Sequence, residues 1–175
     1  MDRCLRCYAM YGLIGGPFPY GLYYSGGMDV LAEKIRALGP NVEMLPTFGF
    51  SEWKEIAKDI QAQPAETRIV IYGHSMGANQ ITAATATVGN RRVDLIAAFD
   101  PTIWYPVNDV GANVERAIWF HGKSLFSPVG HGRLKAGADF KGKIEKYDIG
   151  DRHEIIDDNQ KTHAIVLDAV RALLA

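Results

Sequence analysis

The chain has 175 residues, of which 47% are hydrophobic and 22% charged, and its formal net charge is −1 at pH 7. This length suits one hydrophobic core, so we expect a single domain over residues 1–175. A nearly neutral, ordinary composition gives no electrostatic reason to expect nucleic acid or an anionic membrane as a partner. No apolar run of 18 residues and no leader pattern is present, which predicts a cytoplasmic protein without an integral membrane segment, with secretion of a processed form left open.

Apolar runs and amphipathic stretches alternate along the chain. The first strand is expected within residues 4–12, followed by a helix over 28–38 and a short strand over 42–45. Ser51 is the expected N-cap of a second helix, and Asp157 with Gln160 resembles a capping box for the last helix. The remaining elements are expected as strands over 68–72, 93–99, 117–120 and 144–147, with a helix over 76–88.

The predicted strands are continuous apolar runs, which are typical of a parallel sheet buried on both faces. The expected fold class is therefore α/β: a three-layer sandwich with a mostly parallel sheet of about six strands flanked by helices. In such sheets ligands bind beyond the carboxyl ends of the strands. The loops there carry an unusual number of aromatic residues, namely Phe18, Tyr20, Tyr23, Tyr24, Phe48, Phe50, Trp104, Tyr105 and Phe126. An apolar pocket or a partner surface is expected at this edge.

Two cysteines, Cys4 and Cys7, form a lone C-x-x-C near the N-terminus. No second pair of cysteines or histidines accompanies them at the spacing of a tetrahedral metal site. Their spacing would place them on opposite faces of a strand, which disfavours a disulfide. Neither a metal nor a cofactor is expected.

The motif Gly73-His74-Ser75-Met76-Gly77 joins an apolar strand to a helical run rich in small residues. A serine on so sharp a turn sits in strained backbone, and the flanking glycines let the strand and helix approach closely. We interpret the motif as a nucleophile elbow that presents the Ser75 hydroxyl above the sheet. Because G-x-S-x-G is short, an ordinary glycine-rich turn is the alternative.

A serine nucleophile needs a histidine to take its proton and an acid to orient that histidine. Asp100 follows the strand after the elbow strand, and its alternative role is to initiate a turn. His153 follows the last strand and is the preferred base. His163 is the runner-up, expected to be partly exposed in the last helix, and His74, His121 and His131 stay open as further alternatives.

Two backbone amides should stabilise a tetrahedral oxyanion. Met76 directly follows the proposed nucleophile at a helix start, so its N–H is the first candidate. Leu13, in the turn after the first strand, is the second, with Ile14 as its alternative. The candidate residues of the substrate pocket are Phe18, Tyr20, His74 and Trp104.

These residues together resemble the α/β-hydrolase superfamily. Gly73–Gly77 looks like its elbow, Tyr11-Gly12-Leu13 resembles its His-Gly-x oxyanion turn, and the order Ser75, Asp100, His153 matches its serine, acid, histidine order. Phe99-Asp100-Pro101 resembles the acid-bearing Asp-Pro of the pancreatic-lipase branch, and residues 153–157 are similar to a segment of small bacterial hydrolases. The resemblance covers nearly the whole chain and is greatest to compact lipases, esterases and cutinases without a cap domain.

Three features depart from the usual pattern of that superfamily. Tyr11 stands where a histidine precedes the oxyanion glycine, the first two strands of the full fold are absent, and the acid follows the sixth strand of the family's count instead of the seventh. The fold expected from the resemblance is thus a minimal α/β-hydrolase fold.

The expected function is a serine hydrolase that cleaves a carboxylic ester with an apolar acyl or alkyl group, with a small-molecule or lipid-like ester as substrate. Two alternatives stay open: a thioesterase or acyltransferase with the same triad, and a non-catalytic binding module of the same fold. Acyl chain length, oligomeric state and whether residues 122–142 form a lid are not determined by these patterns.

Overall fold

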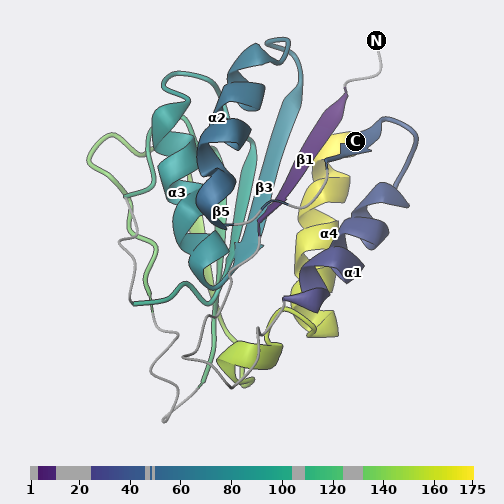
Figure 1. Ribbon diagram of the computed structural model, residues 1–175, viewed down its shortest axis with the longest axis vertical. Coiled ribbons are helices and arrows are strands. Elements are labelled where there is room, and N and C mark those ends of the chain that lie inside the picture. Colours follow the sequence, from purple (N-terminus) through teal and green to yellow (C-terminus); the bar gives the residue numbers. More distant parts are fainter. Residues whose placement is uncertain (1–3, 11–24, 46–47, 49, 104–108, 124–131) are drawn as a thin grey trace.

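A parallel sheet of six strands runs through the computed structural model, which describes residues 4–10, 25–45, 48, 50–103, 109–123 and 132–175 (Figure 1). The strands, in spatial order β2-β1-β3-β4-β5-β6, all pair in parallel. This confirms the predicted α/β fold class. The strand bounds are β1 (Leu5–Met10), β2 (Val42–Met44), β3 (Arg68–His74), β4 (Leu95–Phe99), β5 (Arg116–His121) and β6 (Lys143–Asp148).

Helices cover both faces of the sheet (Figure 1). On one face lie α1 (Gly26–Arg36) and α4 (Gln160–Leu174), and on the other α2 (Trp53–Ala62) and α3 (Met76–Thr87). Along β3, Val70 and Tyr72 pack into the core beside α1 and α4, whereas Ile69 and Ile71 pack into the core beside α2 and α3. Burial of both faces explains why the central strands β3, β4 and β5 are apolar runs without alternation. The edge strand β6 is instead partly exposed and carries charged residues.

Short 3₁₀ helices, η1 (Phe50–Glu52) and η2 (His153–Ile155), precede α2 and α4, and both expected helix caps were wrong. Ser51 lies inside η1, and α2 begins after Glu52 without a side-chain cap. At α4 the cap is Asn159, whose Oδ1 accepts the amides of Lys161 and Thr162. Asp157 does not cap α4 because its Oδ2 accepts the amide of Gly27 in α1 instead.

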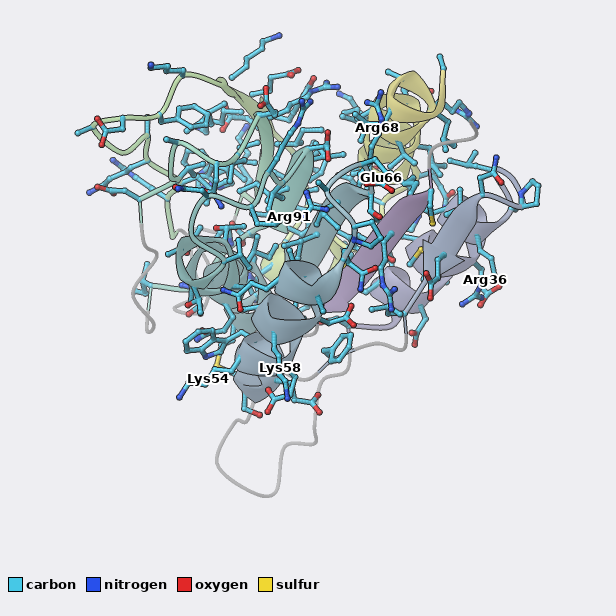
Figure 2. The ribbon with its side chains drawn as sticks, turned by 90° about the horizontal axis from the view of Figure 1, so that it is seen from above. Arg36, Lys54, Lys58, Glu66, Arg68 and Arg91 are labelled. Carbon is cyan, nitrogen blue, oxygen red and sulfur yellow. The ribbon has the colours of Figure 1, made fainter. Side chains whose placement is uncertain are left out.

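The amino edge of the sheet is polar. Figure 2 looks onto this edge and shows Glu66, Arg68 and Arg91 near one another, and these three side chains line one hollow there. The Arg91 guanidinium donates to the backbone carbonyls of Pro64 and Thr67 at 2.8 and 2.9 Å. Charged side chains and backbone bonds thus occupy this edge, and the candidate site residues lie at the other one.

Cys4 and Cys7 are both free thiols, the first exposed and the second buried. Burial raises the pKa of the Cys7 thiol, so it stays protonated within the core. In the part of the chain that the structure describes, no helix combines the length and apolar character needed to cross a membrane.

Gly27 marks a close approach between α1 and the turn before α4. A Cβ built there would lie 2.1 Å from the backbone oxygen of Asp157, whereas one on the neighbouring Gly26 would meet nothing within 4 Å. We therefore expect Gly27→Ala to lower the free energy of unfolding by about 2 kcal/mol or more, through overpacking. Gly26→Ala, the matched control, should change it by less than about 0.5 kcal/mol. Urea unfolding measures both, and equal effects would contradict the close approach.

Candidate active site

Ser75 stands at the junction of β3 and α3, in backbone that an L-residue rarely adopts. Its φ is 57° and its ψ −126°, and its amide donates to the carbonyl of Phe99 at the end of β4 at 3.0 Å. Among the described residues, Ser75 and Asp100 are the only non-glycine residues with positive φ. Strain of this kind persists only where surrounding structure imposes it and is concentrated at functional sites. The residue is fully buried, contrary to the exposed hydroxyl expected from the motif, and its Oγ lies against the His153 ring.

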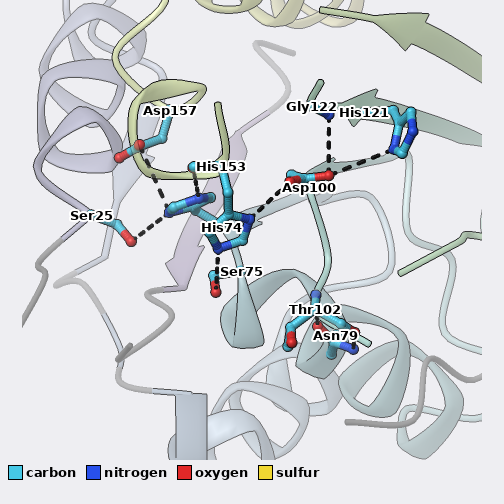
Figure 3. A network of polar contacts seen from close by, with 10 residues as sticks. All are labelled: Ser25, His74, Ser75, Asn79, Asp100, Thr102, His121, Gly122, His153 and Asp157. Atoms are coloured by element: carbon cyan, nitrogen blue, oxygen red, sulfur yellow. Dashed lines mark hydrogen bonds and ion pairs between the residues drawn. The ribbon is translucent and has the colours of Figure 1, made fainter. Parts of the chain in front are cut away.

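His153 lies on η2, just after β6, with its ring between Ser75 and Asp100 (Figure 3). Its Nε2 is 3.0 Å from Ser75 Oγ, and its Nδ1 is 2.8 Å from Asp100 Oδ2. The carboxylate can only accept, so Nδ1 carries the proton in the neutral ring. Nε2 is then the acceptor for the serine hydroxyl, which is the tautomer that a general base requires.

Asp100 directly follows β4 and is held by backbone as well as by His153. Its φ is 41°, its amide donates to Phe120 at 2.8 Å, and its Oδ1 accepts the amide of Gly122 at 3.1 Å. A Cβ on Gly122 would lie 2.9 Å from Asp100 Oδ2. Glycine at 122 therefore leaves room for the carboxylate to approach the end of β5. His121 also faces this carboxylate, with its Nδ1 3.6 Å from Oδ1.

The segment after Asp100 is anchored to α3 by Asn79, a residue that the sequence analysis missed. Its Nδ2 donates to the carbonyl of Thr102 at 2.8 Å, and its Oδ1 accepts the Thr102 amide at 2.9 Å (Figure 3). Both residues are fully buried. Asn79 lies four residues after Ser75, so this pair of bonds ties the acid-bearing loop to the helix that begins at the serine. No pattern in the sequence distinguishes Asn79 from any other polar residue of a helix.

His74, predicted to line the substrate pocket, is buried against His153 with both ring nitrogens bonded inside the protein (Figure 3). Its Nε2 is 2.9 Å from the backbone oxygen of His153, and its Nδ1 is 2.7 Å from Ser25 Oγ. The carbonyl can only accept, so Nε2 carries the proton and the Ser25 hydroxyl donates to Nδ1. The structure thus places the ring behind the candidate base.

The charge states around His74 follow from burial. Burial, followed by the neighbouring His153, lowers the pKa of His74 to about 3, so its ring is neutral at neutral pH. Its contact with Asp157 Oδ1, 3.8 Å from Nδ1, is therefore not an ion pair and is too long for a hydrogen bond. Burial, followed by the neighbouring Asp158, raises the pKa of Asp157 to about 6.

Several predicted site residues lie outside the described part of the chain. These are Leu13 with its alternative Ile14, the pocket candidates Phe18, Tyr20 and Trp104, and the alternative base His131. Met76 is described and is the first residue of α3, where a helix leaves its amide without an intrahelical acceptor. Most of the aromatic residues expected at the carboxyl edge also lie outside the described ranges.

His163, the alternative base, is buried and does not lie on the surface as expected. Its Nδ1 is 3.0 Å from Lys34 Nζ, and its Nε2 bonds to the backbone oxygen of Asp157. The hydrogen bonds shown for the His163 ring thus go to Lys34 and Asp157, and none of them reaches Ser75 or Asp100. The described residues include no group of three or more histidine, cysteine, aspartate or glutamate side chains arranged to hold a metal ion.

No protein-family model and no curated protein sequence matches the chain. Solved structures do match it along nearly its whole length. One is described as a hydrolase of the alpha/beta superfamily from Xanthomonas campestris pv. campestris, with 17% sequence identity, a TM-score of 0.55 and coverage of 97% of each chain.

Two further structures are similar, and one of them is named as an esterase. An acetyl xylan esterase has 13% identity, a TM-score of 0.55 and coverage of 99% of each chain. Est1E from Butyrivibrio proteoclasticus also has 13% identity, with a TM-score of 0.58 and coverage of 99% of this chain and 88% of its own. At these identities the likeness shows the fold alone, and the α/β fold of this chain matches that of the alpha/beta superfamily hydrolase, as the sequence resemblance implied.

The neutral, buried His74 predicts a pH-dependent stability. Above its ordinary pKa of 6.5 the ring is neutral in both the folded and unfolded chain, and its full contribution is present. As the pH falls toward about 3, only the unfolded chain takes up the proton, and the folded state loses stability. Relative to His74→Gln, the wild type should lose about 2 kcal/mol of unfolding free energy between about pH 7 and about pH 5. Denaturant titrations at both pH values test this, and parallel losses in the two proteins would refute it.

Proposed function

We propose that this protein is a serine hydrolase that cleaves carboxylic esters through Ser75, His153 and Asp100. The observation that carries the proposal is the continuous chain of hydrogen bonds from Ser75 Oγ through the His153 ring to Asp100, beginning at a serine in strained backbone. The name of one similar structure, an acetyl xylan esterase, supports ester chemistry over other hydrolytic reactions. The fold supports the same class of reaction by analogy.

The geometry defines a role for each group. His153 Nε2 takes the proton from Ser75 Oγ as the oxygen attacks the carbonyl carbon of the ester, and the carbonyl oxygen becomes an oxyanion. Asp100 keeps the proton on Nδ1 and stabilises the imidazolium that forms. His153 then gives its Nε2 proton to the departing alcohol oxygen, and the acyl group stays on Ser75. Water, deprotonated by the same nitrogen, releases the acid and restores the serine.

The oxyanion is assigned to the start of α3. Met76 supplies a backbone N–H there, and the partial positive charge of the helix N-terminus favours the negative oxygen. Leu13 remains the proposed second donor. Because Ser75 and His153 are buried, these interactions act where little water screens them.

An apolar substrate group is supported by two exposed apolar side chains that follow residues of the proposed triad in the chain. Ile103 follows Asp100 by three residues, Ile155 follows His153 by two, and both are large apolar side chains left exposed. Phe18, Tyr20 and Trp104 remain the proposed aromatic part of the pocket. The proposed substrate is therefore a small-molecule or lipid-like ester with an apolar acyl or alkyl group.

Replacement of the nucleophile tests the proposal directly. Ser75→Ala should reduce hydrolysis of a short-chain chromogenic ester by about 10⁴-fold or more, because no covalent intermediate can form. The variant should also lose labelling by a fluorophosphonate probe. Ser51→Ala, which changes an exposed serine on η1, should keep both properties. Ester hydrolysis by folded Ser75→Ala at the wild-type rate would overturn the proposal.

The acid is tested by a substitution that keeps its shape. Asp100→Asn should lower kcat by about 10³- to 10⁴-fold, because the amide favours the wrong tautomer of His153. Asp94→Asn is the matched control, since Asp94 is also buried beside β4 but accepts the amide of Ile69 at the opposite end of the strand. Steady-state kinetics measure kcat for both variants. An equal loss of kcat in the two would contradict the proposed role of Asp100 as the acid that orients His153.

A further inference from the structure

His74 is bonded to the backbone of the candidate base, and the elbow motif does not require a histidine at this position. We propose that His74 is a positioning residue that fixes His153 through its backbone carbonyl and keeps an uncharged ring beside it. The catalytic consequence rests on the function proposed above. The structural part, that His74 determines the geometry of the His153–Asp100 pair, can be tested without any turnover.

The bond from His74 holds the short segment that carries the candidate base. His153 opens η2, a 3₁₀ helix of only three residues, for which the Ile155 amide donates to Arg152 at 3.2 Å. The His153 side chain points toward Ser75 and Asp100, while its carbonyl is held from behind by His74 Nε2 at 2.9 Å. Because both the ring and the backbone carbonyl of His153 are held, the orientation of the ring is fixed. His74 also precedes Ser75 in the chain, so one peptide unit links the anchor of the base to the nucleophile.

The proton on His74 Nε2 is itself enforced. Nδ1 is 2.7 Å from Ser25 Oγ, and the serine precedes α1, whereas Asp157 approaches the same nitrogen from the turn before α4. The His153 carbonyl can only accept, so the proton of the neutral ring lies on Nε2, and the Ser25 hydroxyl, which can donate or accept, donates to Nδ1. The hydroxyl of Ser25, the residue before α1, thus supports the tautomer that holds η2.

Neutrality of His74 matters because the two rings are close. Their centroids are 4.8 Å apart, with an interplanar angle of 37°. When His153 takes the proton from Ser75 it becomes a cation, and a second cation at that distance would oppose this charge. A neutral imidazole donates the positioning bond without adding a like charge, which lysine or arginine at this position could not do.

Two substitutions of His74 separate the hydrogen bond from the volume of the ring. His74→Leu removes the donor, and we expect kcat to fall about 10- to 100-fold with KM within about two-fold, the range found for residues that orient a catalytic group from behind. His74→Gln keeps an N–H donor and should recover most of kcat. His163→Leu is the matched control, because it removes an equally buried histidine that also bonds to a backbone carbonyl. It should lower stability but leave kcat close to that of the wild type.

A proton NMR signal tests positioning without turnover. The Nδ1 proton of His153, hydrogen-bonded to Asp100, should give a low-field resonance, which Asp100→Asn assigns by abolishing it. We expect this resonance to be lost or shifted in His74→Leu and retained in His74→Gln and His163→Leu. An unchanged resonance in His74→Leu would overturn the inference, even if the protein hydrolyses esters. The proposed function would be overturned instead if the wild type shows this resonance but neither hydrolyses esters nor reacts with the fluorophosphonate.

Ser25→Ala carries the test if His74→Leu does not fold. It leaves the ring in place and removes only the hydroxyl that donates to its Nδ1. We expect a loss of kcat of a few fold and a broadened or shifted His153 resonance, because the ring loses one of the two bonds that hold it. A Ser25→Ala protein with wild-type kcat and an unchanged resonance would contradict the inference that a held His74 ring fixes His153.

Discussion

The hydrogen bond between His153 Nδ1 and Asp100 Oδ2 joins two segments that are 53 residues apart in the chain. One segment leaves β4 and the other follows β6, and β5 lies between them in the sheet. The bond can form only if all three strands end at matching heights, which the register of parallel pairs from β3 to β6 provides. The elbow, the acid and the base therefore depend on a rigid sheet for their mutual geometry, and none of the three is placed by local structure alone.

Much of this architecture could be predicted from the chain itself. Continuous apolar runs indicated strands buried on both faces, and amphipathic spacing indicated the helices, because burial imposes these patterns directly. Ser75, Asp100 and His153 could be selected because parallel strands bring their carboxyl ends to one edge, so position after a strand translates into proximity. Their hydrogen-bonded arrangement follows from that rule, whereas their roles in chemistry stay a proposal.

What could not be predicted depends on contacts between distant residues. His74 was expected in the pocket, since no local pattern shows that Ser25 and the His153 carbonyl occupy its two nitrogens. Asp157 was expected to cap α4, but its carboxylate accepts the amide of Gly27 in α1, which packs closely against the Asp157 backbone. Asn79 resembled any polar helix residue until the bend after β4 brought the Thr102 backbone to it. In each case a buried polar group found its partner through tertiary packing.

The support of Asp100 by Gly122 has a consequence for how this fold can diversify. Gly122, the residue after β5, donates its main-chain N–H to the acid and leaves room for the carboxylate because it has no side chain. A Cβ at this position would crowd Asp100 Oδ2, so a change of the residue after β5 and a change of the acid are coupled. Redesign of the connection after β5 should therefore keep Gly122 and the main-chain bonds of Lys123 to Asp151 and of Gly132 to Pro101.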